Sequence, residues 1–142
     1  MELRQLFSRY EVAINTIYRE INTIIKKYVH SDITADQFTI LQFIHQQDAC
    51  TSTQIANTFG VGKSSVTALV NRLDEKKLII RKRDSNDRRI VYLTLTAEGK
   101  KLVEQTEYEL YRVIGEKLGH FDKDEIESYI IALEKLASLM EE

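Results

Sequence analysis

Positive side chains gather in the central part of this chain. Between Thr51 and Leu95 nine Lys or Arg residues stand against four acidic ones, a net charge of +5, whereas the rest of the chain carries −7. Guanidinium and ammonium groups bind phosphate oxygens, and a basic region on an acidic protein is typical of a surface that faces nucleic acid. The overall charge of −2 hides this asymmetry. The distribution therefore indicates DNA as a partner.

Groups that could act as catalysts or hold a metal are scattered along the chain. His30, His45 and His120 lie far apart, with no metal-type pair spacing and no glycine-rich phosphate loop. His45 and Cys50 come nearest to a nucleophile arrangement, but no motif orients them. We therefore expect no enzyme activity, no catalytic residue, no metal site and no cofactor.

A predicted helix-turn-helix over about 52–77 must position the basic residues. Small Ala56 sits where two helices approach closely, and Gly60 follows where the chain must turn. Val66 and Leu69 then lie one turn apart on the face that packs back onto the first helix. By itself this spacing also fits any pair of packed helices.

The next segment, about 79–95, changes from a helical period to alternation, which predicts a β-hairpin. Turn-forming residues at 84–87 place Arg88 and Arg89 at the hairpin tip. A two-stranded hairpin is marginal alone and needs the helix pair to cover its apolar face. The predicted faces are Val91, Leu93 and Leu95 on one side and Tyr92 and Thr94 on the other.

Helix, turn, helix and hairpin together predict a winged helix, in which the second helix enters the major groove of double-stranded DNA. That helix is expected to begin near Gly62 or Lys63, and Ser and Thr hydroxyls near its start discriminate bases only weakly. The expected base-facing residues are Ser64, Ser65, Thr67 and Ala68. The expected phosphate contacts are Ser52, Thr53, Lys63, Asn71 and Arg72.

The hairpin also resembles the wing of the MarR (multiple antibiotic resistance regulator) family. The resemblance is carried by Asp87, Arg89, Leu93, Leu95 and Thr96, with the helix starting AEGKKL after them, and it covers essentially the whole chain. It implies that Arg89 enters the minor groove, that Asp87 orients its guanidinium, and that Arg88 is a second contact. Narrow A·T-rich minor grooves attract Arg, which agrees with this implication.

The family resemblance further implies a repressor that a small aromatic or anionic effector releases from DNA. The sequence has no clean pocket pattern, and aromatic residues at helical spacing also fit a core. A mixed disulfide or sulfenic acid at Cys50 is an alternative to a small buried cysteine. The candidate effector pocket consists of Tyr10, Tyr18, Tyr28, His30, Phe38 and Phe43.

Long helices flank the predicted winged helix. Apolar residues recur by threes and fours over 3–28, and helices are also predicted over 97–118 and 122–140. Thr34 with Gln37 resembles a capping box that opens another helix. An intramolecular bundle would account for the apolar stripes, as would a homodimer reading a palindromic operator. We expect the homodimer, with segments 1–30 and 97–142 as its dimerisation helices and 34–95 as the winged helix.

Length and composition fit this architecture. A chain of 142 residues suits one domain, 1–142, that is mainly α with a small β-wing. No apolar run approaches the roughly 18 residues of a membrane span, and the start MELRQLF lacks a signal-peptide core. The one cysteine forms no internal disulfide. We therefore expect a cytoplasmic protein without a membrane partner. The alternative function is an architectural or protein-binding winged helix without an effector, for which Arg88 and Arg89 at the tip would have no purpose.

Overall fold

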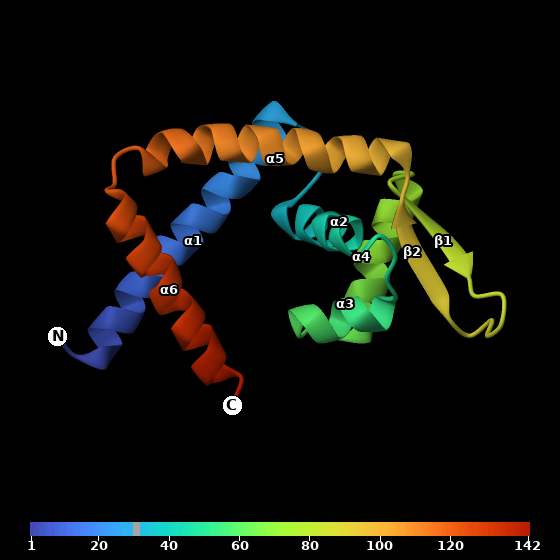
Figure 1. Cartoon of the computed structure of the whole chain (residues 1–142), viewed down its shortest axis with the longest axis horizontal. Helices are drawn as coiled ribbons and strands as arrows, with labels where there is room; N and C mark the ends of the chain where they lie inside the picture. Colours follow the sequence, from blue (N-terminus) through green and yellow to red (C-terminus); the bar gives the residue numbers. More distant parts are fainter. Residues whose placement is uncertain (30–31) are drawn as a thin grey trace. The chain divides into compact units, whose positions relative to one another are not determined.

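A computed structural model describes residues 1–29 and 32–142 of the chain (Figure 1). Its elements divide between two compact units, Met1–Glu109 and Leu110–Glu142. The prediction of a mainly helical protein with a small β-wing is confirmed. In chain order the elements are α1 (Leu3–Tyr28), α2 (Ala35–Gln47), α3 (Ser52–Phe59), α4 (Lys63–Glu75), β1 (Ile79–Arg83), β2 (Val91–Leu95), α5 (Ala97–Leu118) and α6 (Lys123–Met140).

Helix α1 has the bounds that its apolar period predicts, and it is tied to the start of α2. Asn22 Oδ1 accepts a hydrogen bond from the Ala35 backbone N–H at 2.7 Å, and the Tyr18 hydroxyl donates to Asp36. Burial and then the neighbouring Asp36 carboxylate raise the pKa of Tyr18 to about 12. Of the residues in α1 only Ile25 is buried, so most of its apolar side chains are exposed in the single chain.

Helix α2 begins at the capping box that the sequence predicts. The Gln37 backbone N–H donates to Thr34 Oγ1 at 3.1 Å, and the Thr34 backbone N–H donates to Gln37 Oε1 at 3.3 Å. These two bonds satisfy donors that the first helical turn leaves open. Six of the thirteen residues of α2 are buried, which makes it the central helix of the first unit: Ala35, Gln37, Phe38, Ile40, Leu41 and Ile44.

Helices α3 and α4 form the predicted helix-turn-helix. Gly60 has φ 64°, a left-handed conformation that glycine adopts without strain, and it ends α3. Val66 is fully buried, but Leu69 is only half-buried, which corrects the expectation that Leu69 forms the inner face. Val70 and Leu73 complete that face, because residues four and seven positions after Val66 share its side of the helix.

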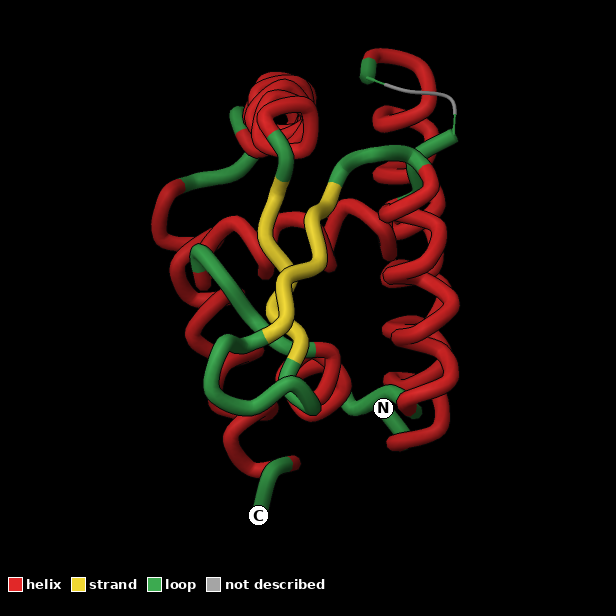
Figure 2. Tube along the Cα trace, turned by 90° about the vertical axis from the view of Figure 1, so that its right-hand side faces the viewer, coloured by secondary structure: helices red, strands yellow, loops and turns green. Residues whose placement is uncertain are grey.

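The two strands form an antiparallel hairpin, the wing (Figure 2). In its register Ile79 lies opposite Leu95 and Arg83 lies opposite Val91. Leu93 and Leu95 are buried while Tyr92 is exposed, so the predicted alternation is confirmed. Cys50 extends the hairpin by an isolated bridge: its N–H donates to the Leu93 carbonyl at 3.1 Å and its carbonyl accepts from Leu93 at 2.7 Å. Burial raises the pKa of the Cys50 thiol to about 11, so the thiol stays protonated at neutral pH.

The start of α5 holds the base of the wing. The Thr96 backbone N–H donates to the Leu78 carbonyl at 3.0 Å, and its hydroxyl donates to the Lys77 carbonyl at 2.8 Å. A Cβ added to Gly99 would lie 2.2 Å from the Leu78 carbonyl oxygen. Only glycine at this position lets α5 approach the strand so closely.

The second unit contains the end of α5 and all of α6. Asp122 precedes α6 as predicted, and its backbone N–H donates to Glu125 Oε1 at 3.1 Å. None of the eighteen residues of α6, all of which the structure describes, is buried. Over residues 1–29 and 32–142 no helix combines the length and the apolar character that a membrane span requires.

Candidate nucleic-acid interface

The first two turns of α4 present polar side chains on a rigid support. Ser64, Ser65, Thr67 and Ala68 are all exposed, while Val66 between them anchors the helix in the core. The Thr67 hydroxyl donates to the Lys63 carbonyl at 2.8 Å. Because the hydroxyl proton is donated to the Lys63 carbonyl, the Thr67 oxygen can only accept a further hydrogen bond. The amino groups of adenine and cytosine are donors that match such an acceptor.

The predicted phosphate-binding residues lie on two helices. Thr53 is exposed and Ser52 half-buried in the first turn of α3, where a second capping box joins Thr51 and Gln54. Lys63 and Arg72 are exposed on α4. The first turn of a helix directs backbone N–H groups outward and attracts anions. The pattern Thr51 to Gln54 matches Thr34 to Gln37 and could have been found in the sequence.

A cavity of about 330 Å³ lies between these helices and the wing. It brings Ser52, Thr67 and Asn71, which the sequence singles out, together with Arg81 and Arg83, which it does not. Asn71 Oδ1 accepts a hydrogen bond from Arg81 Nη2, and Arg81 Nη1 lies 3.5 Å from Asp74 Oδ2. Basic strand residues therefore form part of the polar surface beside α4.

The wing loop is folded by its own acidic residues. Asp84 Oδ2 accepts from the backbone N–H groups of Asn86 at 3.3 Å and Asp87 at 3.0 Å. Arg83 Nη1 donates to the Arg88 carbonyl at 2.8 Å. These bonds hold the loop in one shape at the tip of an otherwise short hairpin.

Asp87 and Arg89 form a two-pronged pair at the tip. Arg89 Nε donates to Asp87 Oδ1 and Arg89 Nη2 donates to Asp87 Oδ2, both at 3.0 Å. The hydrogen bonds from Arg89 lower the pKa of Asp87, and the carboxylate in turn raises the pKa of Arg89. The Arg89 side chain is nevertheless 91% exposed, so its free edge faces solvent in a fixed orientation.

The described residues of the candidate effector pocket contact different neighbours. Tyr10 stacks on Phe7 with ring centroids 6.2 Å apart, whereas Phe43 packs edge-on against Phe59 at 5.4 Å. Phe38 is buried in α2, and Lys27 Nζ lies 5.1 Å from the Tyr28 ring centroid. Tyr18 bonds to Asp36 as described above, and His30 lies outside the described residues.

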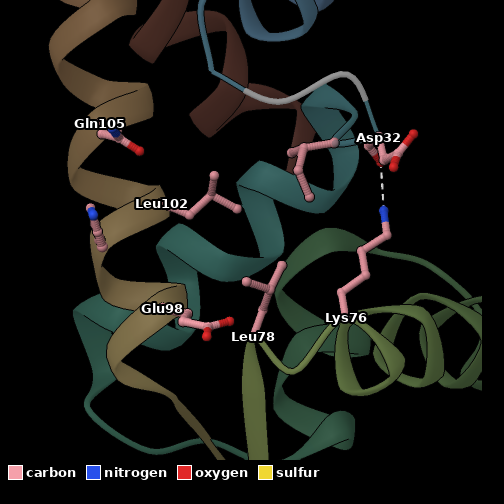
Figure 3. Close-up of a pocket in the computed structure, with 8 residues that line it drawn as sticks. Asp32, Lys76, Leu78, Glu98, Leu102 and Gln105 are labelled. Carbon is pink, nitrogen blue, oxygen red and sulfur yellow. Dashed lines mark hydrogen bonds between the residues drawn. The ribbon is translucent and has the colours of Figure 1, made fainter.

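A cavity of about 380 Å³ lies elsewhere in the first unit, and none of the five described candidate effector residues lines it (Figure 3). At its edge Lys76 Nζ donates to the Asp32 carbonyl at 2.5 Å and to Gln37 Oε1 at 3.3 Å. Leu78 and Leu102 supply apolar walls, and Glu98 adds a carboxylate. Lys76 follows the last residue of α4, so the cavity borders the end of that helix.

Helix-turn-helix, wing and capped α2 together define a winged-helix protein, and comparisons with known proteins relate it to one family. Residues 31–90 match the model of the MarR family. The transcriptional regulator FarR of Neisseria gonorrhoeae is 35% identical over 92 residues, which are 63% of each chain. The S. aureus MepR–DNA complex has a TM-score of 0.79 at 26% identity, with 94% of this chain and 96% of that chain covered.

Streptococcus pneumoniae FabT, solved in a complex with DNA, has the same fold, with a TM-score of 0.85 at 20% identity over 99% of this chain and 98% of that one. These similarities support the resemblance of this chain to the MarR family of transcriptional regulators. Regulators of this family are non-enzymatic DNA-binding proteins, as the sequence predicts for this chain.

Proposed function

We propose that the protein is a homodimeric repressor that binds a palindromic operator through α4 and the wing, and that a small-molecule ligand releases it. The observation that carries the DNA-reading part is the Asp87–Arg89 pair, which holds an exposed guanidinium at the wing tip. A guanidinium in a fixed orientation loses little entropy on insertion into a narrow minor groove.

Helix α4 supplies the major-groove contacts in this proposal. Ser64, Ser65, Thr67 and Ala68 face the bases, and their exposure on a buried support favours that role. Their small side chains provide few strong base contacts, so the shape of the DNA contributes to specificity. MepR, a relative of the same fold, has been solved bound to DNA, which supports this mode of binding.

Phosphate contacts fix the register of the winged helix on the duplex. Ser52 and Thr53 at the start of α3, with Lys63, Asn71 and Arg72 on α4, have this role in the proposal. Arg88 is a second wing contact, and its carbonyl is already held by Arg83. Because these contacts release counterions, affinity should fall steeply with salt for all DNA sequences.

The homodimer is proposed from apolar surface that the single chain leaves exposed. On α1 these residues include Leu6, Phe7 and Ile17, and on α6 they include Ile130 and Leu136. Large apolar side chains exposed along a helix favour a protein partner. A second copy of the chain related by two-fold symmetry would present two α4 helices to two half-sites of an inverted repeat.

Release by a small aromatic or anionic effector follows from the family resemblance. Ligand binding needs only to favour, by about 1–3 kcal/mol, a conformation whose α4 helices no longer match the half-site spacing. Tyr10, Tyr18, Tyr28, His30, Phe38 and Phe43 remain the predicted pocket. A cytoplasmic location likewise remains a prediction, which agrees with DNA as the partner.

The wing contact is tested by measuring the affinity of Arg89→Ala for duplex DNA at fixed salt. We expect a loss of about tenfold or more on specific and nonspecific duplexes, with an unchanged unfolding transition. Lys135→Ala is the matched control, because it removes the same charge from α6, outside the winged helix. Equal affinity of Arg89→Ala and the wild type would contradict the proposed wing contact.

A further inference from the structure

One guanidinium joins the two elements that would enter different grooves of DNA. Arg81 is the middle residue of β1, while Asn71 and Asp74 lie about one turn apart on α4. Arg81 Nη2 donates to Asn71 Oδ1, and Arg81 Nη1 lies 3.5 Å from Asp74 Oδ2. A single planar side chain thus contacts two positions of α4 from the wing.

Stability alone does not explain this bridge. The side chains of Arg81 and Asp74 are 39% and 45% exposed, and ion pairs at such surfaces contribute little to folding. The base of the wing is already held by Thr96, and its apolar face is already covered through Leu93 and Leu95. What the bridge adds is a fixed distance and angle between the outer face of α4 and the middle of the wing.

We infer that Arg81 is a positioning residue for DNA recognition, which fixes the wing relative to α4 so that Arg89 reaches the minor groove while α4 occupies the major groove. The inference rests on the proposed function. Recognition groups must be held within about 0.5 Å of the productive geometry to contribute fully. Without the bridge, α4 still binds, but Arg89 contributes less because the wing samples other positions.

Arginine is required for this role because its planar fork contacts two acceptors at once. A lysine in the same place keeps the charge but has a single ammonium group and loses the two-pronged geometry. Lys82 supplies an internal control: it follows Arg81 on β1, its side chain alternates to the other face, and it is exposed opposite Tyr92.

The test is a set of double-mutant cycles on one operator duplex. The cost of Arg89→Ala in affinity is measured in the wild type, Arg81→Lys, Asp74→Asn and Lys82→Gln, each checked for an unchanged fold by circular dichroism. Arg81→Lys leaves the net charge unchanged and Asp74→Asn raises it by one, so an effect that both share does not come from charge. We expect the cost of Arg89→Ala to be at least about threefold smaller in these two backgrounds. In Lys82→Gln the cost should equal that in the wild type.

Two results would overturn the inference, and they can be told apart. An equal cost of Arg89→Ala in all four backgrounds means that Arg81 does not position the wing, while the proposed wing contact stands. No cost of Arg89→Ala in the wild type means that the proposed wing contact itself is wrong, and the inference fails with it.

Discussion

Helices α2 and α6 differ in the burial of their apolar side chains. Six of the thirteen residues of α2 are buried, whereas none of the eighteen residues of α6, a fully described helix, is buried in the single chain. Within residues 34–95, the predicted winged helix and called the head below, Leu41, Ile55 and Leu73 are fully buried. On α6 and on most of α1 comparable side chains are exposed in the single chain, and the proposed homodimer would cover them. The stability of the head should therefore depend less on a partner chain than the stability of α6.

The largest expected effect is the loss of a buried leucine from the head. Leu41 is fully buried, so Leu41→Ala should lower the free energy of unfolding by about 2–5 kcal/mol at any protein concentration. Leu136→Ala is the matched substitution on α6, where the leucine is 51% exposed in the single chain. Its effect should change with protein concentration, as expected for a dimer contact. Urea unfolding at two protein concentrations measures the free energy of unfolding of both variants. Equal losses that do not change with protein concentration would contradict the contrast between α2 and α6.

A smaller effect is expected from the two glycines of α5. An added Cβ at Gly99 meets the Leu78 carbonyl oxygen, so Gly99→Ala should destabilise the protein by about 1–3 kcal/mol as the wing base moves away. At Gly115 nothing lies within 4 Å of an added Cβ, and Gly115→Ala should stabilise the helix by about 0.5–1 kcal/mol. The urea midpoints of unfolding distinguish Gly99→Ala from Gly115→Ala. A midpoint that shifts in the same direction in both variants would contradict the packing described for Gly99.

The smallest effect concerns the pH dependence of the wing tip. Hydrogen bonds from Arg89 lower the pKa of Asp87, so the pair is fully present above the ordinary carboxyl value of about 4 and is lost as the pH falls through the lowered value. Carbon NMR titration of the Asp87 carboxyl should show a higher pKa in Arg89→Gln than in the wild type. Arg88→Gln is the control and should leave it unchanged. A titration of Asp87 that is identical in all three proteins would exclude the pair in solution.

Features that depend on nearby residues could be predicted from the sequence. The bounds of α1, the capping boxes at Thr34 and Asp122, and the alternating faces of β2 all follow from spacings of two to four residues. Such spacings fix the phase of a helix only approximately. For this reason Leu69 was expected on the inner face that Val70 occupies.

Features that depend on how elements meet could not be predicted in the same way. The Arg81 bridge joins a strand to a helix, and the Cys50 bridge to Leu93 joins residues 43 positions apart. A period identifies the faces of an element but not which faces meet. Tyr10 and Phe43 illustrate this, since the helical period does not show that Tyr10 stacks on Phe7 or that Phe43 packs against Phe59.

Selection from random duplex DNA at physiological salt, followed by sequencing of the retained molecules, tests the central claim most directly. We predict enrichment of an inverted repeat whose half-sites are about one helical turn apart, because two α4 helices related by a two-fold axis must read it. Retention that depends on salt but enriches no sequence would contradict the account and favour an architectural or protein-binding role.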